Sequence, residues 1–375
     1  MAHYKIYVYA ICRDEEKFAL RWAASMSEAD GIFVLDTGST DRTAELLQSC
    51  PKVTVFSKKI EPWRFDTARN LSLSLVPEDA DLCVCTDLDE VFRPGWRACA
   101  EKALAAGAEQ LSYRYIWSFR EDGSEGSVFH ISKMHGRRGF SWKHPVHEVI
   151  TPDNERRPKL VFADGIVLEH HPDKEKSRAQ YLPLLELSVK EAPEDDRNMH
   201  YLGREYMFRG RYDDAVKTLQ KHLALPSAVW ADERCASMRF IAGCFERMQQ
   251  DAEAERWYLR ACAEAPRLRE PWMDLARYFY HKENWYAVIP LIERALSITD
   301  IPMTYISEAQ NRGAAPYDLL SLAYYFTGNK KSALSNVDKA LEYEPENERL
   351  RHNRQFFTDG RNTISARLSM ENAAI

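Results

Sequence analysis

Three acidic residues stand within four positions in the sequence CTDLDEVF, directly after a run of apolar, strand-like residues. Asp87 and Asp89 are two positions apart, so on an ideal strand both carboxylates project from one face. Neighbouring carboxylates repel each other unless they are protonated, hydrated or bridged by a cation. Their oxygens suit Mg²⁺ or Mn²⁺, ions that also hold a diphosphate. We expect Glu90 to face elsewhere, where it stabilises the following turn or supports the ligands without being one.

A second polar motif, VLDTGSTDRT, has the form of a strand that ends in a tight turn before a helix. Asp36 ends the predicted strand, and Gly38 permits the turn. Ser39 adds a hydroxyl, and Thr40 or Asp41 is placed to cap the helix. A helix N-terminus favours an anionic or polar ligand, so the motif predicts a binding site. Turn and capping chemistry alone is the competing interpretation, because each residue is also common in turns.

The elements around these motifs alternate between strand-like and helix-like segments. Strand patterns cover 4–12, 31–38, 52–58 and 80–90, and helical patterns cover 14–29, 40–50 and 65–76. This alternation predicts βαβ units, and hence an α/β domain with a Rossmann-like, mostly parallel sheet. Ligands bind beyond the carboxyl ends of such strands, where both acidic motifs fall. Residues 110–171, rich in aromatic residues and short β-like runs, are expected to form the acceptor-side half of the same domain.

The chain after Pro172 has a helical pattern that repeats. Four degenerate copies of the tetratricopeptide (TPR) pattern begin near Tyr201, Ile241, Trp272 and Tyr317, with small residues where paired helices touch. Extra residues interrupt the series around 297–316. The sequence therefore predicts three regions, which are an α/β domain at 1–175, all-α repeats at 176–348 and a polar tail at 349–375.

Taken in order, the motifs of the first half resemble those of family 2 glycosyltransferases of the GT-A fold. The matching segments are ICRDEEKFALRW, VLDTGSTDRTAELL, EPWRFDTARNLSLSL, LCVCTDLDEVF, HPVHEVI and LEHH. The whole chain is thus similar to a GT-A domain fused to TPR repeats. The resemblance implies an inverting transferase that takes its sugar from a nucleotide-activated donor.

The resemblance also implies roles for individual residues. It assigns binding of the donor to Asp36, Ser39, Asp41, Arg69, Asn70 and Asp87. It assigns Mn²⁺ or Mg²⁺ to Asp89, with Asp87 beside it and His170 or His171 as a further ligand. Strand alternation favours His170 over its neighbour.

Inversion needs a base that removes the proton of the acceptor. Glu148, in HPVHEVI, is the first candidate, with His147 placed to orient it, and Asp122 is the second. A loop histidine beside a surface acid is the competing interpretation. Where relatives carry an Arg-x-x-Arg-like segment, this chain has KMHGRRG, so phosphate contacts there fall to Lys133 and His135 or to the two arginines that follow.

Composition narrows the class of protein. The net charge of −6 provides no overall basic field for nucleic acid, and 45% apolar with 29% charged residues is typical of a soluble globular protein. The N-terminus reads as a strand and not as a signal peptide, and no window approaches the ~20 apolar residues of a membrane span. Eight cysteines lack zinc-site spacing, and Cys83 with Cys85 are expected to be core thiols. Free thiols favour a cytoplasmic location.

Together these features predict a metal-dependent glycosyltransferase. It would move a hexose or N-acetylhexosamine from a UDP-sugar to a hydroxyl or thiol of a peptide or protein, a glycan precursor or modified DNA. The repeats are a candidate surface for holding that acceptor, and homo-oligomerisation is left open. The alternative is a TPR scaffold whose nucleotide-sugar domain is vestigial.

Overall fold

The computed structural model describes residues 4–120, 122–173 and 179–359. The chain divides into two compact units, Met1–Asn198 with Met303–Tyr305, and Met199–Pro302 with Ile306–Ile375. The division falls within the helix α6 (Asp196–Phe208). The predicted boundary between residues 175 and 176 lies outside the described residues.

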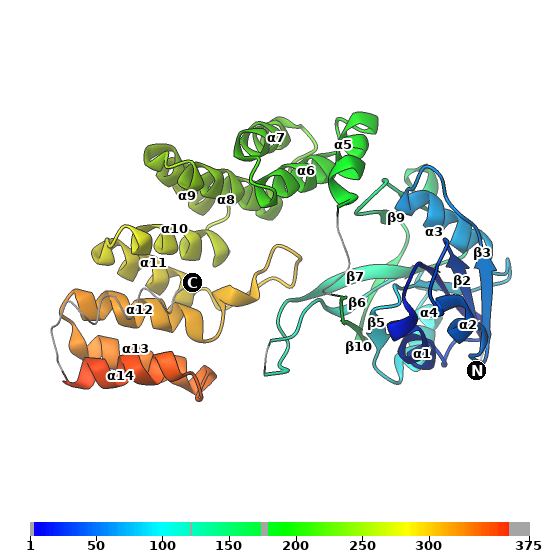
Figure 1. Ribbon diagram of the computed structural model, residues 1–375, viewed down its shortest axis with the longest axis horizontal. Helices are drawn as coiled ribbons and strands as arrows, with labels where there is room; N and C mark the ends of the chain where they lie inside the picture. Colours follow the sequence, from blue (N-terminus) through cyan, green and yellow to red (C-terminus); the bar gives the residue numbers. More distant parts are fainter. Residues whose placement is uncertain (1–3, 121, 174–178, 360–375) are drawn as a thin grey trace. The chain divides into compact units, whose positions relative to one another are not determined.

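The first unit is built on an eight-stranded sheet with the strand order β3-β2-β1-β4-β7-β6-β10-β5 (Figure 1). One half of it contains β1 (Ile6–Cys12), β2 (Gly31–Asp36), β3 (Val53–Ser57) and β4 (Leu82–Cys85). These four strands pair in parallel, with β1 between β2 and β4. The connecting helices are α1 (Glu16–Ser25), α2 (Thr43–Gln48) and α3 (Phe65–Ser74). This half has the strand and helix alternation that the sequence predicts.

The other half of the sheet is mixed, so the prediction of a mostly parallel sheet is wrong there. Its strands are β5 (Glu90–Phe92), β6 (Gln110–Ile116), β7 (Val128–His135) and β10 (Leu160–His170). β7 runs antiparallel to both β4 and β6, and β5 runs antiparallel to β10. The chain passes from β6 to β7 without an intervening helix, and such a connection suits antiparallel pairing because parallel neighbours need a longer crossover.

Different elements cover the two faces of this sheet. The remaining elements of the unit are α4 (Trp96–Ala105), β8 (Phe140–Lys143), β9 (Val149–Pro152), η1 (Asp153–Glu155) and α5 (Tyr181–Glu191). Helices α1, α2 and α4 pack on one face, where Trp22 and Trp96 are fully buried. Helix α3 and the β8–β9 hairpin pack on the other, around Tyr9 and Trp142. Since strand side chains alternate between faces, each strand contributes to both cores.

The cysteines are free thiols, and most of them are buried. Cys83 and Cys85 lie in the core beneath α3, as predicted from their alternation on one strand. Burial raises the pKa of Cys83 to about 12 and that of Cys85 to about 11, so both stay protonated and unreactive at neutral pH.

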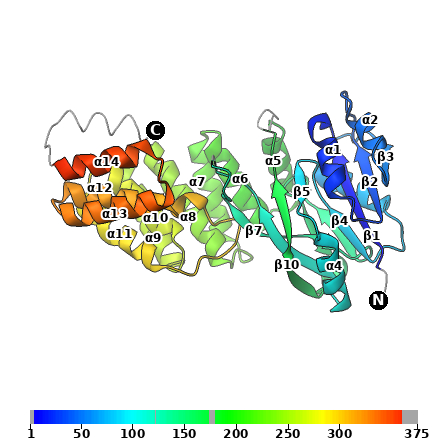
Figure 2. The ribbon, with the colours of Figure 1, turned by 90° about the horizontal axis from the view of Figure 1, so that it is seen from below.

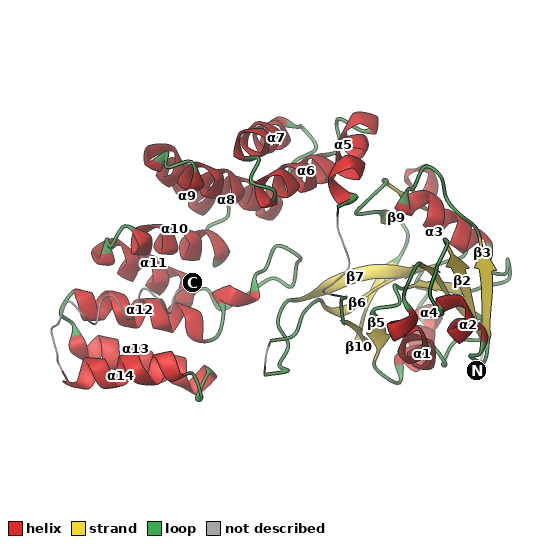
Figure 3. Cartoon of the chain, in the orientation of Figure 1, coloured by secondary structure: helices red, strands yellow, loops and turns green. Residues whose placement is uncertain are grey.

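The described part of the second unit consists of helices and loops (Figure 3). Beyond α6, its helices are α7 (Tyr212–Ala224), α8 (Ala231–Arg247), α9 (Asp251–Glu264), α10 (Glu270–His281), α11 (Trp285–Ser297), α12 (Ala314–Phe326), α13 (Lys330–Tyr343) and α14 (Glu348–Asp359). They form pairs that follow one another in chain order (Figure 2). The predicted interruption is a loop between α11 and α12 that contains a short 3₁₀ helix, η2 (Ala309–Asn311).

The segment predicted as a polar tail begins with a folded helix. α14 buries Leu350 and Phe357, which are seven positions apart and therefore share one helix face. The sequence pattern missed this helix because polar residues dominate its other faces. Residues 360–375 of the predicted tail lie outside the described residues. No described helix combines the length and apolar character needed to cross a membrane.

Close helix packing in the second unit depends on Gly203. A Cβ atom added there would lie 2.5 Å from the Leu219 side chain and 3.3 Å from its backbone nitrogen. Gly243 is also helical, but its Cβ would meet only the flexible end of Arg247 at 3.2 Å and the Tyr258 hydroxyl at 3.8 Å. The two glycines therefore differ in how much room surrounds them.

We expect Gly203→Ala to lower the free energy of unfolding of the second unit by about 1–3 kcal/mol, the usual cost of overpacking. Gly243→Ala is the matched control and should stabilise the unit by up to about 1 kcal/mol, because alanine favours the helix. Urea denaturation followed by circular dichroism measures both. Equal effects of the two substitutions would contradict this account.

Candidate functional site

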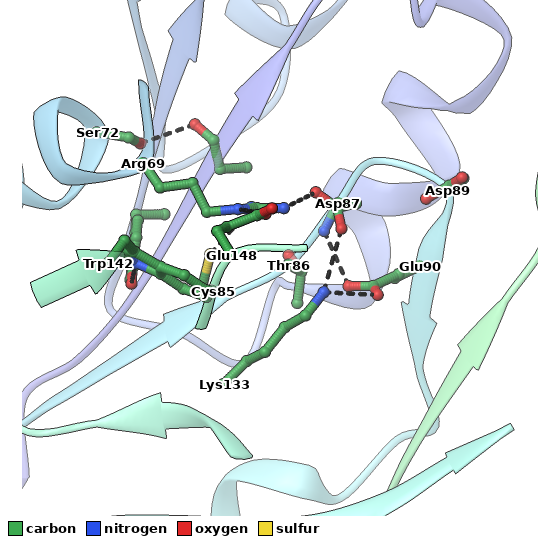
Figure 4. A network of polar contacts seen from close by, with 12 residues as sticks. Arg69, Ser72, Cys85, Thr86, Asp87, Asp89, Glu90, Lys133, Trp142 and Glu148 are labelled. Carbon is green, nitrogen blue, oxygen red and sulfur yellow. Dashed lines mark hydrogen bonds and ion pairs between the residues drawn. The ribbon is translucent and has the colours of Figure 1, made fainter. Parts of the chain in front are cut away.

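The turn after β4 separates the two aspartates. β4 ends at Cys85, and residues 87–89 form a turn before β5 begins at Glu90. Strand alternation therefore no longer applies, and the prediction that Asp87 and Asp89 share one face is wrong. Leu88, between them, is buried in the core. Asp87 points into a buried polar network, and Asp89 lies outside it (Figure 4).

Asp87 is held between two cations. Its Oδ1 accepts a hydrogen bond from Arg69 Nη2 at 2.8 Å, and its Oδ2 accepts one from Lys133 Nζ at 3.1 Å. Burial alone would raise the pKa of Asp87, but Arg69 and Lys133 more than offset this effect, and the pKa lies well below its usual value. The charge of Asp87 is thus balanced without a metal ion.

Glu90 stabilises the turn that precedes it, and not the following turn, for which the sequence predicts this role. It is 1% exposed, and its Oε2 accepts a hydrogen bond from the backbone nitrogen of Asp87 at 2.9 Å. Its Oε1 accepts from Tyr115 Oη at 2.7 Å and from Lys133 Nζ at 3.0 Å. Burial raises the pKa of Glu90 above its usual value, and the positive charge of Lys133 offsets only part of this increase. Three hydrogen bonds therefore hold Glu90 in place, and with it the backbone of the turn that carries Asp87 and Asp89.

Arg69 joins three segments of the chain beneath the turn (Figure 4). Besides Asp87, its guanidinium donates to Glu148 Oε1 through Nε and to Cys85 Sγ at 3.3 Å through Nη1. Its guanidinium carbon also lies 5.1 Å from the ring centre of Trp142. The side chain is nearly fully buried, so this arrangement brings together two predicted site residues, Asp87 and Glu148, around one charge.

Asp89 meets the predicted metal ligand His170. The distance from Asp89 Oδ2 to His170 Nε2 is 3.3 Å, and His170 Nδ1 lies 3.0 Å from the carbonyl oxygen of Trp117. A carbonyl oxygen only accepts hydrogen bonds, so Nδ1 must carry the proton. In neutral His170 the Nε2 lone pair would then face a carboxylate oxygen. A positive charge, either a proton or a metal ion, must lie between them.

The surroundings of His170 favour that charge. Burial opposes protonation of His170, but the Asp89 carboxylate more than offsets it, and the pKa is raised above its ordinary value. The imidazole also stacks on the Trp117 ring at 4.3 Å between ring centres. Tyr115 and Trp117 are functional candidates that the sequence reasoning missed. Their alternate positions in YRYIW place them on one strand face, which could have indicated them.

The other predicted ligands of metal and donor have protein partners. His171 Nε2 lies 3.1 Å from Glu169 Oε2, and its backbone nitrogen donates to the carbonyl of Asp89. Both ends of the Asn70 amide bind the backbone of Trp142, at 2.8 Å each. Asn70 therefore fixes β8 against α3, and the prediction that it lines the donor pocket does not fit this geometry.

The DTGSTD motif is tied together by its own hydrogen bonds. Asp36 Oδ1 accepts from Ser39 through both the backbone nitrogen, at 2.9 Å, and the hydroxyl, at 2.7 Å. Asp41 accepts from the backbone of Thr43 at 2.9 Å and from that of Glu16 at 3.1 Å. These are the turn and capping contacts of the competing interpretation. Asp36 Oδ2 has no hydrogen-bond partner among the described residues, so one oxygen remains for a ligand.

The base candidates lie in different surroundings. The Glu148 side chain is 11% exposed beside Arg69, whereas Asp122 is exposed and accepts a hydrogen bond from the backbone of Ser124 at 2.8 Å. His147 lies in the left-handed backbone region, with φ of 51°, and its ring packs edge-on against another aromatic ring. The geometry brings Glu148, and not Asp122, into the network of the turn.

Comparisons with known proteins bear on the second unit. Residues 199–229 match the family model described as tetratricopeptide repeat. Solved structures similar to the chain include MamA (19% identity, 44% of this chain and 87% of that chain, TM-score 0.35). A second is YrrB, a TPR protein with an unusual peptide-binding site (13% identity, 47% of this chain and 82% of that chain, TM-score 0.36). A third is the C-terminal part of a TPR repeat-containing protein from Cytophaga hutchinsonii (19% identity, 48% of this chain and 67% of that chain, TM-score 0.40).

No curated protein matches the chain. The family match and the helix pairs together make the second unit a helical repeat region of the TPR type. The matched repeat lies outside the first unit, so the resemblance of that unit to family 2 glycosyltransferases stays a prediction.

His135, a predicted phosphate contact, is a core residue instead. It is fully buried, its Nδ1 lies 2.8 Å from the carbonyl oxygen of Gly136, and its Nε2 lies 2.7 Å from Tyr9 Oη. Tyr9 Oη in turn accepts from Trp142 Nε1 at 2.8 Å. These bonds satisfy a neutral imidazole. Burial is the main cause that lowers the pKa of His135 to about 4.

This pKa predicts acid sensitivity. In the unfolded chain His135 takes up a proton near pH 6.5, whereas in the folded protein it stays neutral until about pH 4. The free energy of unfolding therefore falls as the pH drops between these values. We expect this residue to account for about 2 kcal/mol of the stability lost between pH 7.5 and pH 5. His135→Gln should remove that part of the loss in urea denaturation. His130→Gln, at a half-buried position on the same strand, should keep it. An unchanged loss in His135→Gln would contradict the assignment.

Proposed function

We propose that the first unit is a metal-dependent glycosyltransferase that transfers a hexose or N-acetylhexosamine, with inversion, from a UDP-sugar to an acceptor hydroxyl or thiol. The observation that carries this proposal is the pair formed by Asp89 Oδ2 and His170 Nε2, 3.3 Å apart at the end of β10. The type of reaction is inferred from the resemblance of the motifs in the first half of the chain to those of family 2 glycosyltransferases. Asp89 and His170 stand at the positions where the family resemblance expects its metal ligands.

The residues present fit a divalent cation. Adjacent ligands of an octahedral ion with bonds of ~2.1 Å are about 3 Å apart, close to the observed separation. The bond from His170 Nδ1 to a backbone carbonyl is the second contact that metal-binding histidines usually make. Asp89 and His170 would hold the ion, which would neutralise the diphosphate of the donor. Asp87 is left out of this set, because Arg69 and Lys133 already balance its charge.

Glu148 is proposed as the base. Its Oε1 is bound to Arg69, which orients the carboxylate and leaves Oε2 to accept a proton. As the acceptor oxygen or sulfur bonds to the anomeric carbon, the bond from that carbon to the diphosphate breaks. The acceptor proton passes to Glu148, and the nucleoside diphosphate leaves with the electron pair. Asp36, with one oxygen unused by the turn, is proposed to bind the nucleoside.

A binding role without catalysis is the second candidate. The TPR match at residues 199–229 favours it, since helical repeats present extended surfaces to partners. The comparisons support this role for the second unit, whereas the transferase rests on the first unit alone. In the combined proposal the repeats bind the acceptor, which is a peptide or protein, a glycan precursor or modified DNA.

A donor panel tests the transferase. UDP-glucose, UDP-galactose and their N-acetyl counterparts are incubated with the full chain and Mn²⁺ or Mg²⁺, and release of UDP is measured. We expect metal-dependent hydrolysis of at least one donor, and a loss on the order of 100-fold in Asp89→Asn and His170→Gln. Asp164→Asn, an exposed acid on the same strand as His170, is the matched control and should keep full activity.

A binding measurement, taken together with the donor panel, separates the transferase from the scaffold. Calorimetric titration with UDP and Mn²⁺ should show binding that needs the metal. If the chain neither hydrolyses any donor nor binds UDP in the presence of the metal, the transferase proposal is contradicted and the scaffold role is the remaining candidate. Full activity in Asp89→Asn would show that the metal assignment is wrong.

A further inference from the structure

The loop between α11 and α12 lies against the repeats themselves. The first helices of three successive pairs lie side by side, α8 with α10 and α10 with α12. Residues 306–311 of the loop contact side chains of α8 and α10. Ile306 and Ser307 are buried, and Asn311 is fully buried. The loop is therefore packed on the helix face that α8 and α10 share.

A charged stripe on α10 faces this segment. Glu270, Asp274 and Arg277 are spaced by four and three positions, which places them on one side of the helix. Asp274 accepts from Arg277 Nη1 at 2.9 Å and from Arg239 Nε of α8 at 2.7 Å. One carboxylate thus orients two guanidinium groups from neighbouring helices before either contacts the loop.

Helices α8 and α10 bind both side chains and backbone groups of the loop. Arg239 Nη2 donates to the Glu308 carboxylate at 2.7 Å, and the backbone nitrogen of Glu308 donates to Glu270 Oε1 at 3.1 Å. Arg277 Nη2 donates to Asn311 Oδ1 at 2.6 Å and to the carbonyl oxygen of the residue before it at 3.4 Å. Two side chains and two backbone groups of the loop are recognised.

Burial strengthens the contact with Glu308. Arg239 is 4% exposed, so its two carboxylate partners satisfy a charge that water does not reach. Burial alone would raise the pKa of Glu308, but Arg239 more than offsets it, and the pKa is lowered. Glu308 thus supplies the second of the two carboxylates that bind Arg239, beside Asp274 of α10.

We propose that the face formed by Arg239, Glu270, Asp274 and Arg277 is a peptide-binding site, that residues 306–311 occupy it as a tethered ligand, and that its external partner is a peptide with glutamate followed three positions later by asparagine. Arg239 binds the carboxylate of the glutamate, and Arg277 binds the side-chain amide of the asparagine. Glu270 accepts a hydrogen bond from the backbone of the peptide. This inference is independent of the proposed transferase, because every contact lies within the second unit.

Peptide binding in trans tests this site. A fluorescent peptide with the sequence of residues 306–312, ISEAQNR, is titrated with the full chain and followed by anisotropy. The wild-type chain should bind weakly, since a tethered segment competes at millimolar effective concentration. Glu308→Ala with Asn311→Ala should free the face and tighten binding at least ~10-fold. Adding Arg277→Ala should reverse that gain.

Controls and a second measurement keep the outcome decisive. Asp300→Ala, at an exposed position of the same loop, should bind as the wild type does, and the peptide ISAAQAR should not bind the double variant. Excess heavy-isotope peptide should also accelerate hydrogen exchange of the wild-type segment 306–312, with no substitution needed. The proposal fails if the double variant binds no tighter than the wild type, if ISAAQAR binds equally, or if exchange is unchanged.

Discussion

The arrangement of the first unit depends on a buried guanidinium. Arg69 lies almost fully out of water, and removing such a charge from water costs several kcal/mol unless anions and hydrogen-bond acceptors surround it. Asp87, Glu148 and Cys85 supply these partners from the turn after β4, the loop before β9 and the end of β4. The strand end, the turn and the loop are thus fixed together, because one guanidinium binds a group from each of them and only Asp87 and Glu148 balance its charge.

This constraint assigns different roles to two aspartates that look alike in the sequence. Asp87 is bound to Arg69 and Lys133, and Glu90 fixes its backbone, so its task is to hold the turn. Asp89 is thereby placed at the end of β10, where its Oδ2 lies 3.3 Å from His170 Nε2. In neutral His170 this nitrogen would be an acceptor, and it would repel the carboxylate. The structure therefore creates a position for a positive charge, either a proton or a metal ion, without using Asp87.

Local patterns predicted much of the fold. Strand and helix periodicity placed β1–β4 with their helices, and the repeat pattern placed the helix pairs and the loop at 297–316, because each signal lies within a short stretch of chain. Cys85 as a core thiol also followed from local spacing. The helix α14 was missed, since its two buried apolar residues stand among many polar ones.

Features that depend on distant partners could not be predicted. Asn70 looks like a ligand-binding residue until the backbone of Trp142, 72 positions away, takes both ends of its amide. His135 looks like a phosphate contact until Tyr9 meets it in the core. The mixed half of the sheet depends on which strands pair, and residue spacing does not determine that choice.

The central claim is that Asp89 and His170 hold one divalent cation between them. Electron spin echo spectroscopy of the chain loaded with Mn²⁺ tests it directly, because the method detects nitrogen bound to manganese. We predict a nitrogen coupling in the wild-type protein that disappears in His170→Gln and persists in His171→Gln. Bound Mn²⁺ without a nitrogen coupling, or a coupling that survives in His170→Gln, would contradict the account.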